Sequence, residues 1–179
     1  MNKLYTPSGH ASAKSIRIDQ ALLNILEKKA EDENLSTNAF IESILMKYAT
    51  HYMYLEDYPS IILSQQMFQS FIREITDENI EELGNQLGNI GFRGYLLMRG
   101  ITPSLDSILR ILELNYGKEG GWFDYHCHDV GGKKLVHCTH RYGLKWSKFL
   151  ANYIETIFYE ILEFDIDVEY TESYVTMRI

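Results

Sequence analysis

Four of the six histidines and both cysteines lie within fifteen residues of one another, namely His126, Cys127, His128, His137, Cys138 and His140. Imidazole and thiolate groups bind zinc, nickel, copper or iron. If the chain turns at Gly131–Gly132, two alternating runs pair as a hairpin that puts His126 opposite His137. Alternation then places the candidate metal or ligand residues on one face: His126, His128, His137, Thr139 and Arg141.

Other interpretations of this segment stay open, because its spacing does not match the usual structural zinc patterns. The histidines could be ordinary polar residues on a solvated or interfacial sheet face, a pH-sensitive cluster, or an anion pocket. The opposite face is predicted to be apolar and to pack beneath a helix; it carries Phe123, Tyr125, Cys127, Val136 and Cys138. The cysteines would then be small core residues.

The elements that position these residues form an α+β domain over residues 60–179. After a boundary at Pro59, helices are predicted from Ser64 and from Thr76, followed by a glycine-rich, loop-like stretch over 88–100 with a short strand at 95–98. Thr102 and Pro103 predict another helix start. The hairpin, an apolar helix over 144–164 and a second hairpin over 165–179 then predict antiparallel hairpins packed on a long helix.

The N-terminal segment has a different pattern. Over residues 13–19, Ile16 and Ile18 alternate with Ala13, Ser15 and Arg17, which predicts a short strand. Asp19 is a suitable N-cap for a helix to about residue 34, where Asn34 can take the left-handed conformation. Ser36 can cap a second helix from Thr37. The predicted order is therefore strand, helix, tight turn and helix.

The run SIRIDQALLNILEKKAEDENLSTNAFIESILMKYA resembles the ribbon-helix-helix transcriptional regulators. The resemblance implies an intertwined homodimer over residues 13–56, preceded by a flexible arm over 1–12, whose paired strands enter the DNA major groove. By resemblance, Ala13, Ser15 and Arg17 read bases, and Ser36, Thr37 and Asn38 contact a phosphate. The alternative is an assembly or antitoxin-like protein in which this module only dimerises and binds a protein partner.

Two further resemblances concern the C-terminal domain. Some ribbon-helix-helix regulators carry a C-terminal nickel-sensing domain, so a repressor responsive to zinc or nickel is another alternative. HCTHRYGL followed by an apolar helix and a strand is similar to the tail of haem-nitric-oxide-binding domains, where a Tyr-x-Ser-x-Arg pattern holds haem. The matching positions are His137, Thr139 and Arg141; two of the three differ, so we expect no haem.

Composition narrows the function further. The 179 residues carry a net charge of −8, yet residues 1–50 hold equal numbers of basic and acidic side chains, so the charge lies in the remainder. No nucleotide-binding, hydrolase or zinc-protease motif is present, and we expect no enzyme. Without a signal sequence, a membrane span or a disulfide framework, we expect a cytoplasmic protein. The sequence thus predicts a sequence-specific DNA-binding regulator, a homodimer or dimer of dimers, whose C-terminal domain senses a ligand or sets the oligomeric state.

Overall fold

The computed structural model describes residue 10 and residues 12–53 and 61–179. The chain divides at residue 60 into two compact units, called here the N-terminal unit and the C-terminal unit. The flexible arm expected over residues 1–12, the boundary expected at Pro59, and the last residues of the 13–56 module lie largely or wholly outside the described residues. None of the described helices is long and apolar enough to cross a membrane.

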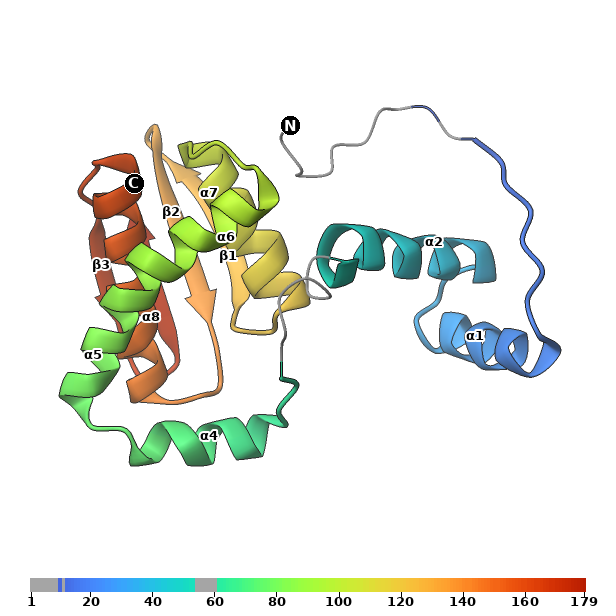
Figure 1. Ribbon diagram of the computed structural model, residues 1–179, viewed down its shortest axis with the longest axis horizontal. Helices are drawn as coiled ribbons and strands as arrows, with labels where there is room; N and C mark the ends of the chain where they lie inside the picture. Colours follow the sequence, from blue (N-terminus) through green and yellow to red (C-terminus); the bar gives the residue numbers. More distant parts are fainter. Residues whose placement is uncertain (1–9, 11, 54–60) are drawn as a thin grey trace. The chain divides into compact units, whose positions relative to one another are not determined.

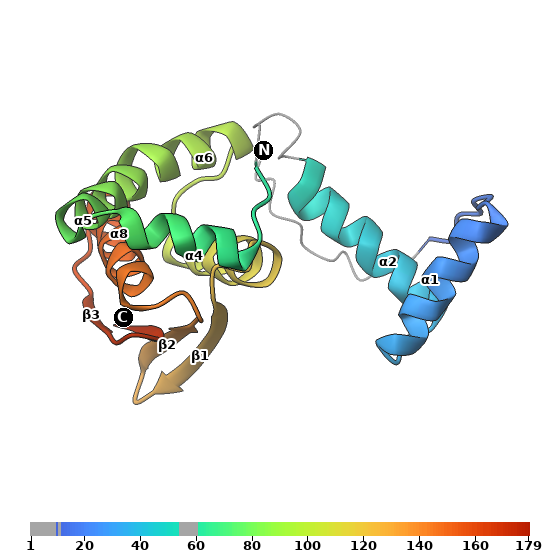
Figure 2. The same ribbon diagram turned by 90° about the horizontal axis from the view of Figure 1, so that it is seen from below.

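The N-terminal unit contains two helices joined by a tight turn (Figure 2). Helix α1 spans Gln20–Asp32, and the Asp19 carboxylate accepts hydrogen bonds from the first N–H groups of the helix. The chain reverses at Asn34, which has a left-handed φ of 56°. Helix α2 spans Thr37–Lys47, is capped by the Ser36 hydroxyl and continues as the π-helical turn η1, Tyr48–Tyr52. The predicted caps, turn and helices are confirmed.

The strand predicted over residues 13–19 is not formed in the single chain, because residues 12–19 have no regular secondary structure. A strand needs a neighbour to satisfy its backbone N–H and C=O groups. Every described strand of this chain already belongs to the sheet of the C-terminal unit. Among the described residues, 12–19 are not paired with any of these strands.

A four-stranded antiparallel sheet organises the C-terminal unit (Figure 1). Its strands are β1 Asp124–Val130, β2 Lys133–Thr139, β3 Asp167–Tyr170 and β4 Tyr174–Arg178. They lie in the order β1-β2-β4-β3, so the second hairpin joins the first through β4. Gly131 and Gly132 form the first turn, both with positive φ, and His126 lies opposite His137. Both predicted hairpins and this register are confirmed.

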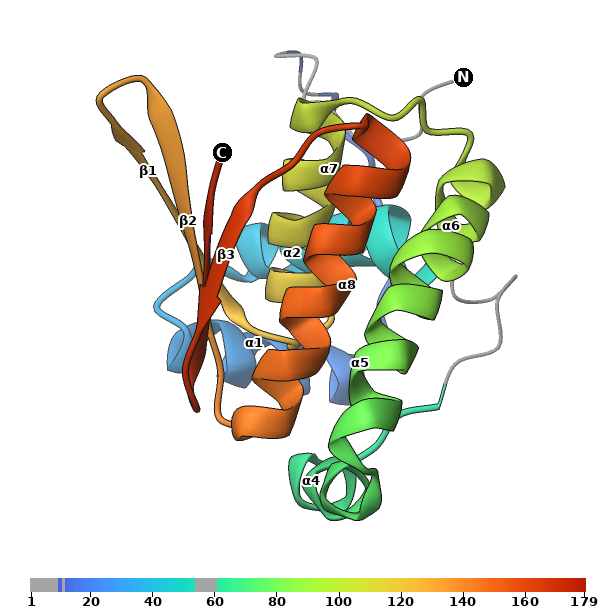
Figure 3. The same cartoon turned by 90° about the vertical axis from the view of Figure 1, so that its left-hand side faces the viewer.

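Helices cover one face of the sheet in two layers (Figure 3). The long helix α8, Leu144–Leu162, packs on the sheet, and beyond it run α5 Asp77–Gln86, the π-helical turn η2 Leu87–Gly91 and α6 Phe92–Arg99. The remaining elements are α4 Gln65–Glu74, α7 Leu105–Ile111 and the π-helical segment η3 Leu112–Glu119. Ser64 and Thr76 cap α4 and α5 as predicted, whereas α7 begins after Ser104, two residues later than Thr102.

The prediction of a loop-rich stretch with a short strand over residues 88–100 is wrong, because this stretch is helical up to Arg99. Gly88 in this stretch, and Gly84 just before it in α5, serve close helix packing. A Cβ added at Gly84 would lie 2.8 Å from the Phe149 carbonyl oxygen, and one at Gly88 would lie 2.6 Å from the Tyr153 carbonyl oxygen. Glycine is therefore needed for the backbones of this run and of α8 to touch.

The core of the C-terminal unit is built largely from aromatic rings. On α8, Trp146 stacks on Phe149, and Phe149 stacks on Tyr153, at centroid distances of 4.7 and 5.6 Å. The hydroxyl of Tyr153 donates a hydrogen bond to that of Tyr116, over 2.8 Å. Burial raises the pKa values of both phenols, so both stay neutral. This packing fixes α8 and, through it, the sheet.

Candidate nucleic-acid interface and sheet-face site

The predicted base-reading side chains, Ala13, Ser15 and Arg17, are all exposed in the single chain. Two residues after Arg17, Asp19 fixes the start of α1. The segment is therefore anchored at its C-terminal end and presents its side chains to solvent. This arrangement can contact a ligand as large as DNA, whose major groove admits two antiparallel strands.

The predicted phosphate contacts lie at the N-terminus of α2. The Ser36 hydroxyl accepts a hydrogen bond from the N–H of Ala39 over 3.2 Å, Thr37 is half-buried and Asn38 is exposed. The N-terminus of a helix carries partial positive charge and N–H donors, which favour an anion such as phosphate. The structure thus brings Ser36, Thr37 and Asn38 into one helical turn.

The N-terminal unit has almost no core of its own in the single chain. Ala30 is the only buried residue of α1, and α2 buries none. Large apolar side chains that are exposed in this unit are Ile16, Leu22, Ile25, Leu35, Ile44 and Leu45. Such a set of exposed apolar residues in a small module indicates a surface that is covered in the functional state.

In the C-terminal unit, the predicted histidines lie on the sheet face that the helices leave open. His126 and His137 are cross-strand neighbours, with His128 two pairs further toward the turn and on the same face. Thr139 ends β2, and Arg141 lies beyond the strand and is exposed. Among the described residues, no three His, Cys, Asp or Glu side chains are grouped closely enough to hold a metal ion. The histidines share a face, but their arrangement does not form a metal centre.

The two cysteines differ from the expectation that both would be core residues. Cys138 on β2 is fully buried, and burial raises the pKa of its thiol, so it is a poor nucleophile. Cys127 is exposed, because β1 is the edge strand and its hairpin extends beyond the helices (Figure 3). The alternation of side chains along β1 predicted the correct sheet face for Cys127, but the helices that cover this face do not extend over its position.

A shallow depression of about 500 Å³ on the open face combines predicted and unpredicted residues. Its lining comprises Leu135, His137, Thr139, Glu169, Tyr174, Thr176 and Arg178. The Nδ1 atom of His137 and the Thr176 hydroxyl form a hydrogen bond of 2.7 Å. The sequence analysis missed the β3 and β4 residues, because alternation groups side chains within a hairpin but does not show which hairpins pair.

The one cation of this depression is already neutralised. Arg178 donates hydrogen bonds to Asp167 over 2.9 Å and to Glu169 over 2.8 Å. The guanidinium lowers the pKa of Glu169, and the two carboxylates raise the pKa of Arg178. The depression is therefore polar without a net positive charge, and its chemistry suits a neutral polar ligand better than an anion.

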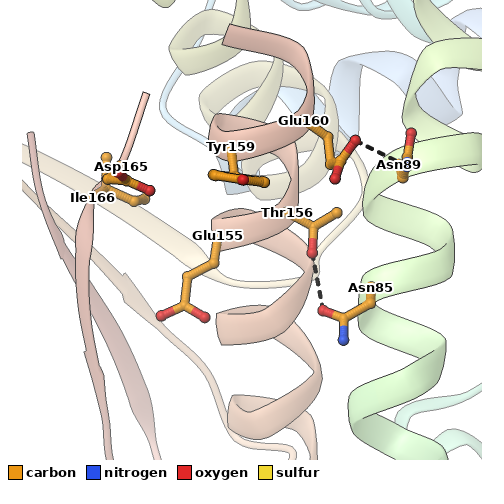
Figure 4. A pocket seen from close by; sticks show the side chains of 8 residues that line it. All are labelled: Asn85, Asn89, Glu155, Thr156, Tyr159, Glu160, Asp165 and Ile166. Atoms are coloured by element: carbon orange, nitrogen blue, oxygen red, sulfur yellow. Dashed lines mark hydrogen bonds between the residues drawn. The ribbon is translucent and has the colours of Figure 1, made fainter. Parts of the chain in front are cut away.

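A second depression, of about 440 Å³, is lined by α8, by Asn85 and Asn89 on one side of it, and by Asp165 and Ile166 on the other (Figure 4). Its hydrogen bonds join α8 to α5 and to η2: Thr156 donates to Asn85 over 2.9 Å, and Asn89 donates to Glu160 over 3.3 Å. Burial, followed by the negative charge of Asp167, raises the pKa of Glu155. Because these polar groups connect elements of the fold, the depression has a structural role.

The fourth histidine of the cluster, which was not among the predicted site residues, is buried behind the sheet. His140 Nε2 and the Ser147 hydroxyl are 2.9 Å apart, and both residues are buried. The N–H of Tyr142 donates to His140 Nδ1, so the ring proton sits on Nε2 and is donated to Ser147. An imidazole in this tautomer cannot remove the proton of Ser147, and burial lowers the pKa of His140 to about 4. The pair therefore stabilises the fold as a neutral hydrogen bond.

Comparison with protein-family models, curated proteins and solved structures finds no match to this chain.

Proposed function

We propose that this protein is a homodimeric, sequence-specific DNA-binding transcriptional regulator that reads DNA with its N-terminal unit. The observation that carries the proposal is the uncovered apolar surface of that unit. Ile16 is 61% exposed and Ile25 is 61% exposed, while Asp19, Asn34 and Ser36 fix the helix ends as a ribbon-helix-helix module requires. Burying such side chains is the main driving force for association.

A second copy would complete the module. Residues 13–19 of two chains can pair as an antiparallel ribbon, which satisfies their backbone groups and turns Ile16 and Ile18 toward the shared core. Ala13, Ser15 and Arg17 then face the major groove, where the Arg17 guanidinium can bond a guanine with two hydrogen bonds. Ser36, Thr37 and Asn38 would hold the flanking phosphate and fix the register.

The C-terminal unit would modulate DNA binding by the N-terminal unit without contacting the bases itself. Its acidic surface repels the phosphate backbone and therefore weakens non-specific binding, which leaves discrimination to the N-terminal unit. The sheet-face depression, lined by His137, Thr176 and Tyr174, offers a place for a small polar ligand. Binding of such a ligand would change how the two C-terminal units of a dimer contact each other. It would thereby change the distance between the two DNA-reading N-terminal units.

The test is fluorescence anisotropy of the full chain on labelled fragments of its own upstream region, at two salt concentrations. Arg17→Ala is expected to weaken specific binding by about 1–3 kcal/mol and to relax the base preference at one position. Lys28→Ala, which removes the same charge from α1, is the matched control and should change the salt dependence alone. Equal effects of the two variants would contradict base reading by Arg17. No binding by the wild type would favour the alternative of a dimerising partner-binding protein.

A further inference from the structure

The helical run α5–η2–α6 carries uncovered apolar side chains on its outer side. Ile90 is 70% exposed and Leu97 is 82% exposed, and Leu87 is partly exposed beside them. Gly94 and Leu97, three residues apart in α6, lie on one side of that helix, and Leu87 and Ile90 are the exposed apolar residues of the preceding π-helical turn η2. We call Leu87, Ile90, Gly94 and Leu97 the outer seam.

No described residue of the C-terminal unit covers this seam. The opposite side of the run is buried, with Ile80, Phe92 and Leu96 in the core and Gly84 and Gly88 against α8. Figure 3 shows α8 and then the sheet on that buried side, and no further element of the C-terminal unit beyond the run. Apolar residues at three- and four-residue intervals are the pattern that a second helix covers.

The charges around the seam suit a second copy of the same surface. Residues 83–101 contain no Asp or Glu, although the chain as a whole has a net charge of −8. The one exposed cation beside the seam, Arg93, already bonds to Glu160 of its own chain. Two such surfaces can therefore approach without like-charge repulsion, whereas a strongly charged partner would find no complementary group.

Gly94 adds an observation about how closely a partner could approach. A Cβ added there would have no heavy atom within 4 Å, in contrast to Gly84 and Gly88, whose close contacts to α8 exclude one. Glycine lowers the stability of a helix interior, and at Gly94 nothing within the chain compensates for that cost. A second backbone passing over this position would use the missing side chain.

We propose that the outer seam pairs with the outer seam of a second copy, so that the C-terminal units of a dimer are joined helix to helix. The inference rests in part on the proposed function. The seam covers about 15 Å of helix, which is short for an independent interface. A dimer held at its N-terminal units raises the effective concentration of the C-terminal units to about the millimolar range. The pairing then adds a second contact between the two chains of the dimer and sets the separation of its two DNA-reading N-terminal units.

The test uses disulfide cross-linking of the full chain, with Cys127→Ser to remove the exposed native thiol. Ile90→Cys and Gly94→Cys place reporters in the seam, and Glu172→Cys, in the exposed turn between β3 and β4, is the control. At least one seam reporter is expected to form covalent dimers under mild oxidation, and the control is not. Adding Leu97→Glu should slow that cross-linking about tenfold or more, because it removes a buried leucine and brings two carboxylates together.

Light scattering of the same samples separates this inference from the proposed function. A dimeric wild type whose seam reporters cross-link no faster than the control would overturn the seam pairing and leave the N-terminal dimer standing. Cross-linking that persists in an Ile16→Asp chain of unchanged dimeric mass would support the seam and contradict the N-terminal dimer. A wild type that stays monomeric at all concentrations would overturn both.

Discussion

The two units of this protein differ in whether one chain suffices to build a core. The C-terminal unit buries one face of α8, the centre of the sheet and a continuous array of aromatic rings. The N-terminal unit has equally well-defined helix caps, yet its helices bury Ala30 alone. Capping and turn chemistry are local properties and are satisfied in both units, whereas burial requires enough chain, or a second one, to surround the apolar residues.

This difference in core formation determines what each unit can do by itself. A unit with a complete core can hold a fixed set of polar side chains, as the His137–Thr176 pair on the sheet face illustrates. If the N-terminal unit dimerises as proposed, its stability depends on protein concentration, because its folding is then coupled to association. We expect that the first keeps its structure on dilution and that the second does not.

The largest expected effect is a loss of stability of the C-terminal unit, whose core is complete within one chain. Phe92 is fully buried among Tyr95, Tyr116 and Tyr153, and Phe92→Ala should lower the free energy of unfolding by about 3–5 kcal/mol. Both tryptophans of the chain lie in this unit, so urea unfolding followed by tryptophan fluorescence reports on it directly. Phe71→Ala removes the same ring from a site that is 57% exposed and should cost far less. Equal costs would contradict the single-chain core.

The next effect is a pH dependence in the same unit. His140 is buried and neutral, with its pKa lowered to about 4 from an ordinary value of 6.5. Between these values the unfolded chain binds a proton that the folded chain does not, so stability falls as pH drops from 6.5 to 4. The loss should reach about 3 kcal/mol, measured by urea unfolding across that range.

Two variants locate the origin of that pH dependence. His140→Asn should flatten the slope between pH 6.5 and 4, whatever it does to stability at neutral pH. His128→Asn, which removes an exposed histidine from β1, should leave the slope unchanged. A slope that survives His140→Asn would assign the effect to another group.

The smallest expected effect concerns the N-terminal unit and tests the comparison most directly. In the Leu97→Glu chain, which removes the proposed pairing of the C-terminal units, amide exchange in α1 and α2 should become about tenfold faster on a hundredfold dilution, because unfolding of the proposed N-terminal dimer is coupled to dissociation. Exchange in α8 should not change. Hydrogen-exchange mass spectrometry at two protein concentrations measures both in one sample, and concentration-independent exchange in α1 would refute a shared core.

The elements with local signals were predicted well from the sequence. Asp19, Ser36, Ser64 and Thr76 each combine a capping side chain with an apolar repeat, and all four cap helices. Gly131–Gly132 between two alternating runs gave the first hairpin and its register, and with it the faces of His126 and His137. In each case a few neighbouring residues decide the outcome.

The predictions that failed depend on contacts between distant segments. Gly88 suggested a loop, because a glycine serving close helix packing cannot be distinguished in sequence from one serving a turn. Cys127 was assigned to the core, because alternation gives the face of a strand but not how far the covering helices reach. The residues that complete the sheet-face depression were missed, since the pairing of β4 with β2 joins segments about forty residues apart.

The strand order β1-β2-β4-β3 has a consequence for synthesis on the ribosome. The strand that joins the two hairpins, β4, is the last of the four along the chain, so the sheet cannot close until Arg178 has been made. The N-terminal unit emerges more than a hundred residues earlier, and its apolar helices are exposed throughout that interval. At about 5–20 residues per second this interval lasts several seconds or longer. Under the proposed dimerisation, the nascent N-terminal units on neighbouring ribosomes of one message would be able to associate before either sheet has formed.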